Sequence, residues 1–437
     1  MSGKDFDIIL VGAGIIGLAS AYHLKKMMPD RSILVVEKES DHSQGNTGRS
    51  VAGFRDFFST TINAQLARAS INFYKYVQED LEYGIGMRET GYLFLMSKSK
   101  FDSMKYVIDT LQTSTKLRVL DRNELASIPA FRVSLENEEA VQLNLQPIEV
   151  GVLGMNCGVL EIERLSSYYY DECKKLGIEF SFKTEVNSLE VVPENASGFP
   201  GEPFLWQNKI IGEISTNRGS FSAEKYVLTT GAWTGKLLDS IGVDSHIKVK
   251  KRFVYQIGGE SVKKLVGASY GLNEADLFPF TVLPSHGVYL RPHPPSRTFW
   301  VSTSGTTSDQ ELGPTFSYES PDKIDFTEPT DEYFDYNILP VIRAYLNGLD
   351  DLKITGKWTG YYSLNTQDKT PYVFQFLNAI VATGGSGAGL MKADSIGRIV
   401  ASMAAGIEST TLFDKSKIKN SDLGITERNV GIESLRF

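Results

Sequence analysis

The first 37 residues follow the order of apolar and polar positions that is typical of a strand, a helix and a second strand. Residues 6–11 (FDIILV) form a short apolar run, as expected of a strand buried on both faces. A helix is predicted from about residue 15 to 28 and ends before Pro29, because proline cannot continue it. A second apolar run, Ile33–Val36, ends at the acidic residue Glu37. The pattern predicts a βαβ unit.

The rest of the chain changes its periodicity several times. Helical spacing predicts helices over residues 61–77, 101–113, 162–176 and, after a glycine turn that begins at Gly384, up to about 405. Apolar or alternating runs predict strands over residues 91–96, 140–150, 178–182, 185–192, 225–229, 356–362, 372–376 and 379–383, and strand-like runs dominate residues 248–301. Breaker residues predict a turn at 158–161, a surface insertion at 193–209 and an irregular segment at 308–330.

This order of elements predicts an α/β protein in which a Rossmann-type nucleotide-binding domain is joined to a second, β-sheet-rich domain. A length of 437 residues favours two or three domains. The nucleotide-binding domain is expected to be discontinuous, with residues 1–85, 150–245 and 352–437. Residues 86–149 and 246–351 are expected to form the substrate-binding domain.

Composition narrows the class of protein. The formal net charge is −8 and no basic block occurs, so we expect no nucleic-acid partner. The charged N-terminal residues lead directly into a strand, and no run of about 18 apolar residues could span a membrane. We therefore expect a cytoplasmic protein, free or resting on a membrane surface, as a monomer or in a homo- or hetero-oligomer. Two cysteines favour reduced thiols, and the five scattered histidines predict no metal site.

Three glycines mark the turn after the first strand as a phosphate-binding turn. Gly12, Gly14 and Gly17 have the G-x-G-x-x-G spacing. The first allows a tight turn, the second lets the backbone approach a pyrophosphate, and the third lets the helix pack closely on the strand. Glu37 lies 20 positions after Gly17, where a carboxylate accepts hydrogen bonds from a ribose hydroxyl and repels a 2′-phosphate. The pattern predicts a nucleotide cofactor other than NADP.

Two further glycine turns indicate that the nucleotide is long. Residues 379–392 (AIVATGGSGAGLMK) are predicted as a strand, a turn and a helix, whose N-terminus offers a second partial positive charge. Residues 229–234 (TTGAWT) follow another strand. Three separate turns suit FAD better than a nicotinamide dinucleotide, because a helix end beside the flavin ring can stabilise the negative charge of its reduced form.

Six motifs then occur in the order known from one family. They are residues 12–17 (GAGIIG), 37–38 (EK), 47–55 (TGRSVAGFR), 230–233 (TGAW), 358–368 (WTGYYSLNTQD) and 385–390 (GSGAGL). On these residues the chain resembles the FAD-dependent D-amino acid oxidase / glycine-sarcosine oxidase superfamily over essentially its whole length. Within it, the chain is most similar to the archaeal dye-linked L-proline dehydrogenases, through the GRSVAGFR loop, the GYLFL strand, the insertion ending near Trp206 and the SGAGLMKADSIGR segment.

The resemblance implies a set of contacts with FAD. The residues expected to make them are Gly12, Ala13, Gly14, Ile15, Ile16, Gly17, Glu37, Lys38, Asn46, Thr47, Gly48, Arg49, Ser50, Ala52, Gly53, Phe54, Val186, Thr230, Gly231, Trp233, Gly360, Gly385, Ser386, Gly387, Ala388, Gly389, Leu390 and Met391. Sarcosine oxidases of the family attach the flavin through a cysteine near the stretch that is here Gly360–Asn365 (GYYSLN), which has neither cysteine nor histidine. FAD is therefore expected to be non-covalent.

The resemblance also implies oxidation of an amine by hydride transfer to flavin N5. A substrate carboxylate then needs a cation, and the planar fork of arginine suits it best. Arg55 and Arg291 are the two candidates, with Tyr289 as a hydrogen-bonding partner. Lys392 is next, but it lies one position after the carboxylate-binding lysine of sarcosine oxidase, so Met391 is the alternative at that place. A surface salt bridge for Arg291 and core packing for Tyr289 are equally ordinary interpretations.

The leading hypothesis is an FAD-dependent dehydrogenase of a secondary or cyclic amino acid, with L-proline as the first candidate. A quinone or another electron carrier is the expected acceptor, because Trp300 falls where sarcosine oxidases have a lysine that favours superoxide formation. Lys250 or Lys251 could supply that charge instead, while Phe54, Trp233 and Trp300 could wall an apolar pocket. The alternatives are an oxygen-using sarcosine, glycine or D-amino acid oxidase, a 2-hydroxy acid dehydrogenase, and an electron-relay flavin subunit of a complex.

Overall fold

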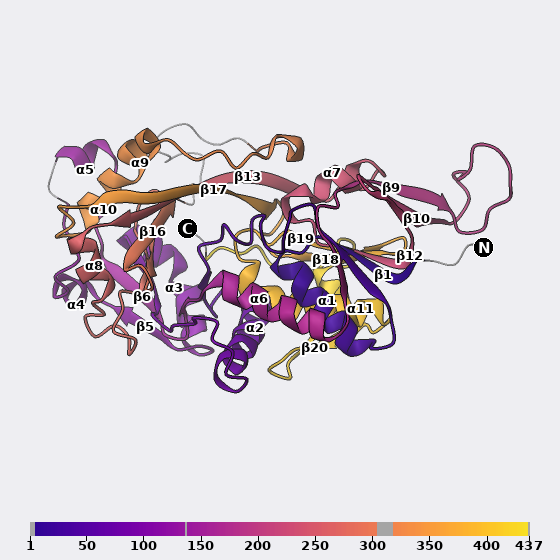
Figure 1. Ribbon diagram of the computed structural model, residues 1–437. Helices are drawn as coiled ribbons and strands as arrows, with labels where there is room; N and C mark the ends of the chain where they lie inside the picture. The colour runs from indigo at the N-terminus through magenta and orange to yellow at the C-terminus, as the bar shows by residue number, and fades with distance from the viewer. Residues whose placement is uncertain (1–4, 136–137, 304–317, 436–437) are drawn as a thin grey trace.

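The computed structural model describes residues 5–135, 138–303 and 318–435. Figure 1 shows an elongated molecule with two lobes, one built around β1, β12, β18 and β19 and the other around β5, β6, β15 and β16. Two long strands, β13 (Ile247–Gly258) and β17 (Lys353–Asn365), run between the lobes. Two sheets with separate cores confirm the predicted fold class, a Rossmann-type unit joined to a β-rich unit.

The first lobe contains a six-stranded sheet in the order β18-β19-β12-β1-β2-β8. Its strands are β1 (Phe6–Val11), β2 (Ile33–Val36), β8 (Glu179–Ser181), β12 (Ala223–Leu228), β18 (Tyr372–Phe376) and β19 (Ala379–Thr383). All neighbours pair in parallel except β18 with β19. The carboxyl ends of β1, β2 and β12 meet at one edge of the sheet. The glycine turns that follow β1 and β12 therefore lie at that edge, together with Glu37 at the end of β2.

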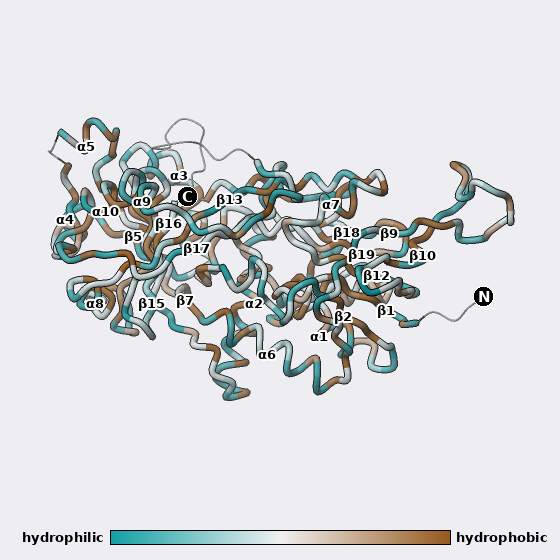
Figure 2. Tube along the Cα trace, turned by 45° about the horizontal axis from the view of Figure 1, so that its top comes forward, coloured by the Kyte–Doolittle hydropathy of each residue, from teal (hydrophilic) through white to brown (hydrophobic). Residues whose placement is uncertain are grey.

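Helices cover one face of this sheet and a small sheet covers the other. The helices are α1 (Ile15–Met27), α2 (Thr61–Glu79), α6 (Ile162–Lys175) and α11 (Ala393–Ala404). The small sheet consists of β9 (Val186–Pro193), β10 (Lys209–Thr216) and β11 (Gly219–Phe221), and α7 (Thr234–Asp239) packs beside it. The loop between β9 and β10 extends away from the body of the molecule (Figure 2) and exposes Leu205 and Trp206, which confirms the predicted surface insertion.

The second lobe contains an eight-stranded sheet in the order β17-β13-β16-β15-β14-β4-β6-β5. Its other strands are β4 (Tyr92–Met96), β5 (Leu117–Leu120), β6 (Val150–Gly154), β14 (Phe280–Val282), β15 (Val288–His293) and β16 (Thr298–Thr303). One face packs on α4 (Arg122–Ala126), α5 (Glu138–Gln142), α8 (Glu260–Val266), α9 (Asp331–Asn337) and α10 (Leu339–Tyr345). Alternation along each strand therefore divides its side chains, so that Leu93 and Leu290 enter this core whereas Tyr92 and Tyr289 face the other side.

Four short strands and one helix complete the described chain. They are β3 (Gly53–Phe54), β7 (Gly158–Val159), β20 (Ser409–Thr411), β21 (Lys417–Lys419) and α3 (Lys98–Gln112). No helix in these ranges is both long and apolar enough to cross a membrane. The predicted domain ranges stay a prediction. Two strands from the ranges assigned to the nucleotide-binding domain, β6 and β17, pair within the eight-stranded sheet.

Several predicted elements were wrong. The strand at 140–150 is instead the end of α5 and a turn, because Asn144 has a φ of 50° and Pro147 has no N–H to give to a ladder. The helix expected after Gly384 begins later, with a 3₁₀ turn at Leu390–Lys392 that leads into α11. The predicted turn at 158–161 contains β7, which pairs with β3. Part of the irregular segment 308–330 lies outside the described residues.

Candidate active site

The turn from β1 to α1 has the geometry of a phosphate-binding turn. Gly12 has a φ of +103°, and a Cβ on Gly17 would lie 2.0 Å from Gly12 O, so neither position tolerates a side chain. Gly14, the residue before α1, has no side chain to cap the helix, and Thr47 Oγ1 occupies only the N–H of Ile15 among the described contacts. The remaining N–H groups of the first turn and the positive end of the helix dipole are suited to an anion. The Glu37 carboxylate, at the end of β2, accepts a hydrogen bond from Ala13 N at 2.7 Å.

The loop that contains Asn46, Thr47 and Arg49 ties this turn to β17. Thr47 Oγ1 accepts from Ile15 N at 3.1 Å, and Asn46 Oδ1 accepts from Tyr361 N at 2.7 Å. The Arg49 carbonyl accepts from Trp358 Nε1 at 3.0 Å. The loop thus places polar side chains between the two lobes.

A cavity of about 300 Å³ lies where the three glycine turns meet the eight-stranded sheet. The residues expected at FAD that line it are Gly14, Ile15, Ile16, Asn46, Thr47, Arg49, Ser50, Gly53, Gly231, Gly360, Gly385, Ser386, Gly387, Ala388, Gly389, Leu390 and Met391. Of the substrate candidates, Arg55, Tyr289 and Lys392 line it as well. The structure therefore brings the ends and the middle of the chain together around one space.

Other expected residues do not line this cavity. They are Gly12, Ala13, Gly17, Glu37, Lys38, Gly48, Ala52, Phe54, Val186, Thr230, Trp233 and Arg291. Gly12 and Gly17 lie next to the lining residues, in the turn from β1 to α1. Lys38 and Trp233 contact each other, with Lys38 Nζ 3.7 Å from the centroid of the Trp233 ring. The assignment of individual residues to cofactor or substrate stays a prediction.

Comparison with known proteins identifies the family. The profile of the DAO family, described as FAD-dependent oxidoreductase, matches residues 7–403. The chain belongs to this family. FAD-dependent oxidoreductase domain-containing protein 1 from Bos taurus is 25% identical over 427 residues, which cover 91% of this chain and 80% of that protein. Monomeric sarcosine oxidase from Bacillus sp. (strain B-0618) is 23% identical over 65% of this chain and 64% of that protein.

Solved structures share the fold. L-proline dehydrogenase from P. horikoshii superimposes with a TM-score of 0.74 and 20% identity, covering 96% of this chain and 97% of that chain. Glycine oxidase from Geobacillus kaustophilus gives a TM-score of 0.69 with 16% identity, covering 94% and 98%. These structures confirm the fold, and the family profile confirms the predicted superfamily.

The residues present fit FAD, the cofactor of this family. The uncapped N-terminus of α1 suits the pyrophosphate, Glu37 suits a ribose, and the turn Gly385–Gly389 borders the same cavity. Among the residues that line the cavity there is no cysteine or histidine. Both cysteines, Cys157 and Cys173, are buried elsewhere.

Arg252 is a cavity residue that the sequence analysis missed. Its side chain is buried, and its Cζ lies 5.1 Å from the centroid of the Tyr362 ring. Its Nη1 donates to Lys251 O at 3.1 Å, and its Nε has no partner in the described part of the chain. A buried guanidinium with an unused N–H beside a cavity is suited to bind an anion.

Arg55 is buried deeper and is largely used by the protein. Its Nη1 donates to Phe57 O at 2.8 Å and its Nη2 to Leu435 O at 2.7 Å. Burial lowers the pKa of the Arg55 guanidinium, and the nearby Glu433 carboxylate partly offsets this effect. Arg55 thus supplies positive charge to the cavity while its terminal N–H groups hold two backbone carbonyls.

Arg291 does not reach the cavity lining. It is fully buried, its Nη2 donates to Leu160 O at 2.7 Å, and its Cζ lies 4.4 Å from the centroid of the Trp300 ring. Its Nε and Nη1 have no partner in the ranges that the structure describes. Burial lowers the pKa of Arg291 to about 9. The surface salt bridge considered for it is therefore wrong.

The aromatic wall of the cavity differs from the predicted one. Phe54, Trp233 and Trp300 do not line it. Its aromatic residues are Phe58, Tyr92, Phe280, Tyr289, Tyr361 and Tyr362. Tyr361 and Tyr362 belong to the 358–368 motif and Tyr289 was a substrate candidate, whereas Phe58, Tyr92 and Phe280 were not singled out. For Tyr92 and Phe280 the alternation along β4 and β14 is the signal that could have indicated them.

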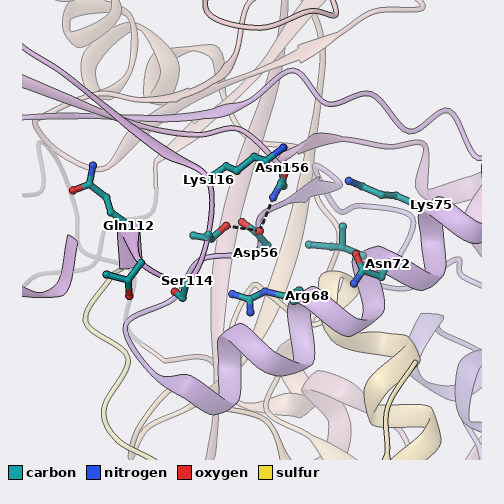
Figure 3. A pocket seen from close by; sticks show the side chains of 11 residues that line it. Asp56, Arg68, Asn72, Lys75, Gln112, Ser114, Lys116 and Asn156 are labelled. Carbon is teal, nitrogen blue, oxygen red and sulfur yellow. Dashed lines mark hydrogen bonds between the residues drawn. The ribbon is translucent and has the colours of Figure 1, made fainter. Parts of the chain in front are cut away.

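A second hollow of about 450 Å³ lies between α2 and the loop after α3 (Figure 3). Arg68, Lys75 and Lys116 border it, and Asp56 lies at its centre. The Asp56 carboxylate accepts from Thr115 Oγ1 at 2.6 Å and from Asn156 Nδ2 at 3.3 Å. None of the candidate FAD or substrate residues lines this hollow. Among the described residues there is also no group of three His, Cys, Asp or Glu side chains that could hold a metal ion.

Proposed function

We propose that this FAD-dependent oxidoreductase oxidises a secondary or cyclic amino acid, with L-proline as the first substrate to test, to the corresponding imine. The observation that carries the proposal is Arg252, a buried arginine with an unpartnered Nε at the cavity. A buried cation of this kind is suited to a carboxylate ligand. The similarity in fold to an L-proline dehydrogenase supports the choice of substrate.

In this proposal the residues of the chain bind, orient and shield the substrate. Arg252 binds the carboxylate, and Arg55, whose guanidinium lies over Tyr92 and Phe94 of β4, adds positive charge from the segment after β3. Tyr92, Phe280 and Tyr289 lie face to face in a stack, with ring centroids 4.1 Å apart for the first pair and 5.3 Å apart for the second. They provide an apolar surface for a ring and exclude water. The bound FAD supplies the chemistry of accepting a hydride.

Orientation is the main contribution expected from the protein. Fixing the substrate carboxylate also fixes the direction of its C–H bond, and positioning effects of this kind lower barriers by several kcal/mol. The proposed acceptor of the electrons is a quinone or another carrier.

The oxygen-using oxidase is kept as a second candidate because of Arg291. The guanidinium of this arginine lies over Trp300, at the place where the sequence predicted no positive charge. Arg291 does not line the cavity, but a buried cation within electrostatic reach of a reduced flavin would favour the formation of superoxide from oxygen. The position of Arg291 therefore weakens the argument that Trp300 alone keeps oxygen from reacting.

A substrate panel tests the proposal. The purified protein with FAD is mixed with L-proline, sarcosine, D-alanine or 2-hydroxyglutarate, and both dye reduction and peroxide formation are measured. We expect dye reduction with L-proline and little peroxide. Peroxide formation as fast as dye reduction identifies an oxidase, and reduction only by 2-hydroxyglutarate identifies a hydroxy acid dehydrogenase. No reduction by any of the four supports an electron-relay subunit.

A further inference from the structure

Lys392 is a buried amine at the cavity, and within the described part of the chain it has one hydrogen-bond acceptor. Its side chain is 1% exposed and borders the cavity. Its Nζ donates to Asn63 Oδ1 at 2.7 Å and lies 4.5 Å from the centroid of the Phe58 ring. It has no ion pair within the described ranges. A protonated amine would therefore hold two N–H groups without an acceptor, whereas a neutral amine would keep a lone pair for a ligand.

The orientation of Asn63 is fixed by its other partners. Its Nδ2 lies 2.8 Å from Thr60 Oγ1, 2.9 Å from Thr370 Oγ1 and 3.3 Å from Glu433 Oε2. Because the Glu433 carboxylate can only accept, the atom facing it must be the amide nitrogen. The amide oxygen consequently faces Lys392, so Lys392 is the donor of that bond in either protonation state.

Two charged groups from different segments face Lys392. Arg55 comes from the segment after β3, and Glu433 comes from the end of the described chain. Burial lowers the pKa of Lys392 to about 7, Glu433 raises it, and Arg55 lowers it. Asp394, two residues further on, is held by His23 Nε2 at 2.6 Å and Arg398 Nε at 2.7 Å. The surroundings thus favour an amine that can change its protonation state during a reaction.

We propose that Lys392 is a catalytic residue that accepts the proton of the substrate ammonium group in the cavity. The inference rests on the proposed function. An amino acid arrives with its nitrogen protonated, and in that state the nitrogen has no lone pair to form the C=N bond. The Nζ lone pair of Lys392 takes one proton from that nitrogen. The freed lone pair forms the C=N bond of the protonated imine as the C–H bond breaks and its hydride passes to the cofactor, and the product loses its remaining N–H proton to solvent. The proton on Nζ then passes to solvent.

A carboxylate-binding ammonium is the competing role for the same side chain, and two substitutions distinguish the roles. Lys392→Arg keeps a positive charge but cannot lose its proton at neutral pH, whereas Lys392→Met removes both properties. For a proton acceptor, both variants lose kcat. For a carboxylate anchor, Lys392→Arg keeps most of kcat and Lys392→Met mainly raises KM.

The main experiment is the pH dependence of kcat/KM for the substrate that the panel identifies. We expect a rise through about pH 7 in the native enzyme, because the amine must lose its proton to act. In both Lys392 variants this limb should vanish, with kcat/KM at pH 8 lower by about 10²- to 10⁴-fold. The remaining activity should rise only toward the ionisation of the substrate ammonium itself. An unchanged limb in Lys392→Met overturns the proposal.

Glu433→Gln provides a second variant that keeps Lys392. Because the Glu433 charge raises the pKa of Lys392, its removal should move the rising limb to lower pH. Glu427→Gln is the matched control, since Glu427 lies on the same segment, is exposed and forms an ion pair with the exposed Lys419 at 3.6 Å. This control should leave the limb in place. A limb that does not move in Glu433→Gln contradicts the inference. FAD content and Tm establish that each variant is folded.

A readout without turnover separates the inference from the proposed function. NMR of the FAD-loaded protein with ¹³C-labelled lysine should show one side chain that titrates near pH 7 and is missing in Lys392→Met. If every amino acid fails to reduce the native enzyme, the proposed function fails whatever this titration shows. If L-proline is oxidised but no lysine titrates below pH 9, the role of Lys392 is refuted while the proposed function stands.

Discussion

Arg252 and Arg55 differ in how much of each guanidinium is left for a ligand. Arg55 gives its two terminal nitrogens to Phe57 O and Leu435 O, whereas Arg252 gives one bond to Lys251 O. A group already held by backbone carbonyls must break those bonds before it can bind a substrate bidentately. Arg252 is therefore the better carboxylate anchor, and Arg55 is better understood as a fixed charge.

Removal of Arg252 should weaken substrate binding with FAD still bound. Arg252→Met should raise KM for the amino acid by a factor that corresponds to about 2–5 kcal/mol, because the substrate carboxylate loses its buried partner. Arg55→Met should affect KM less and Tm more. Arg218→Met, at an exposed arginine beyond β10, serves as the control. Steady-state kinetics decide, and an unchanged KM in Arg252→Met means that the carboxylate is bound elsewhere, for example by Arg55 or Arg291.

The reaction with oxygen provides a prediction for Trp300 and Arg291. Neither side chain lines the cavity, so we expect slow reoxidation of the substrate-reduced enzyme by air and fast turnover with a dye. Stopped-flow absorbance measures both rates. If reoxidation by air is as fast as dye turnover, and Arg291→Met slows it, the enzyme is an oxidase that uses this arginine.

The sequence predicted some of these residues and not others for definite reasons. Arg55 belongs to the TGRSVAGFR motif, and Lys392 follows the GSGAGL motif, so both could be found by pattern. Arg252 lies in KVKKRFVYQIG, where cations occur on both faces of the strand. Which face meets the cavity depends on the pairing of β13 with β16 and β17, which no local pattern encodes. Glu433 has no motif at all and acts only through a contact between segments far apart in sequence.

The segment after Leu423 is held against α2 and the loop before β18 by buried ionic contacts. Arg428 forms a two-pronged pair with Asp368, with N···O distances of 2.6 and 2.7 Å. The Glu433 carboxylate accepts from Ser59 N at 2.9 Å and Thr60 N at 3.2 Å, at the N-terminus of α2. An anion beside a helix N-terminus is stabilised by the helix dipole. Glu433 thus fixes the two residues that precede α2 and places its negative charge at that helix end.

The stability contributed by Glu433 should depend on pH. Burial alone would raise the pKa of Glu433, but the charge of Arg55 and the bonds from Ser59 hold it below its ordinary value. A carboxyl group whose pKa is lower in the folded than in the unfolded chain stabilises the fold at pH values above its ordinary pKa. This contribution is lost as the pH falls through the pKa of the folded state. Glu433→Gln should therefore lower the free energy of unfolding at pH 7 by about 1–3 kcal/mol.

Urea unfolding at several pH values measures this difference. The gap between the native protein and Glu433→Gln should narrow as the pH falls below about 4.5, the ordinary value for a glutamate. Glu427→Gln should show no gap at either pH. A gap that stays constant down to pH 3 would assign the effect to packing rather than charge.

The two lobes share one cavity, and its lining bears on how the cofactor is held. The residues around it include tyrosines, serines and two lysines but no cysteine or histidine, and Gly360–Asn365 offers neither. We predict one non-covalent FAD per chain. Acid precipitation should release all of the yellow colour into the supernatant. Flavin that stays with the precipitated protein would contradict the prediction.

The general architecture was more predictable than its details. The βαβ unit, the glycine turns and the β-rich middle follow from local periodicity, so the fold class was predicted. The helices α8, α9 and α10 were missed because they are short and their apolar faces become regular only when packed on the eight-stranded sheet. The strand predicted at 140–150 failed because apolar content was counted without regard to Pro147 and Asn144.

The order of strands in the six-stranded sheet has a consequence for the making of the protein. β1 and β2 leave the ribosome before β12, which is the neighbour of β1 on its other side, and β12 in turn pairs with β19 at residues 379–383, which is made later still. Until β12 has been made, one edge of β1 has no partner strand, and until β19 has been made, one edge of β12 has none. An unpaired, apolar strand edge is prone to aggregation. The nascent chain should therefore depend on chaperones until β19 emerges, and FAD can be enclosed only after the glycine turn Gly385–Gly389 has been made.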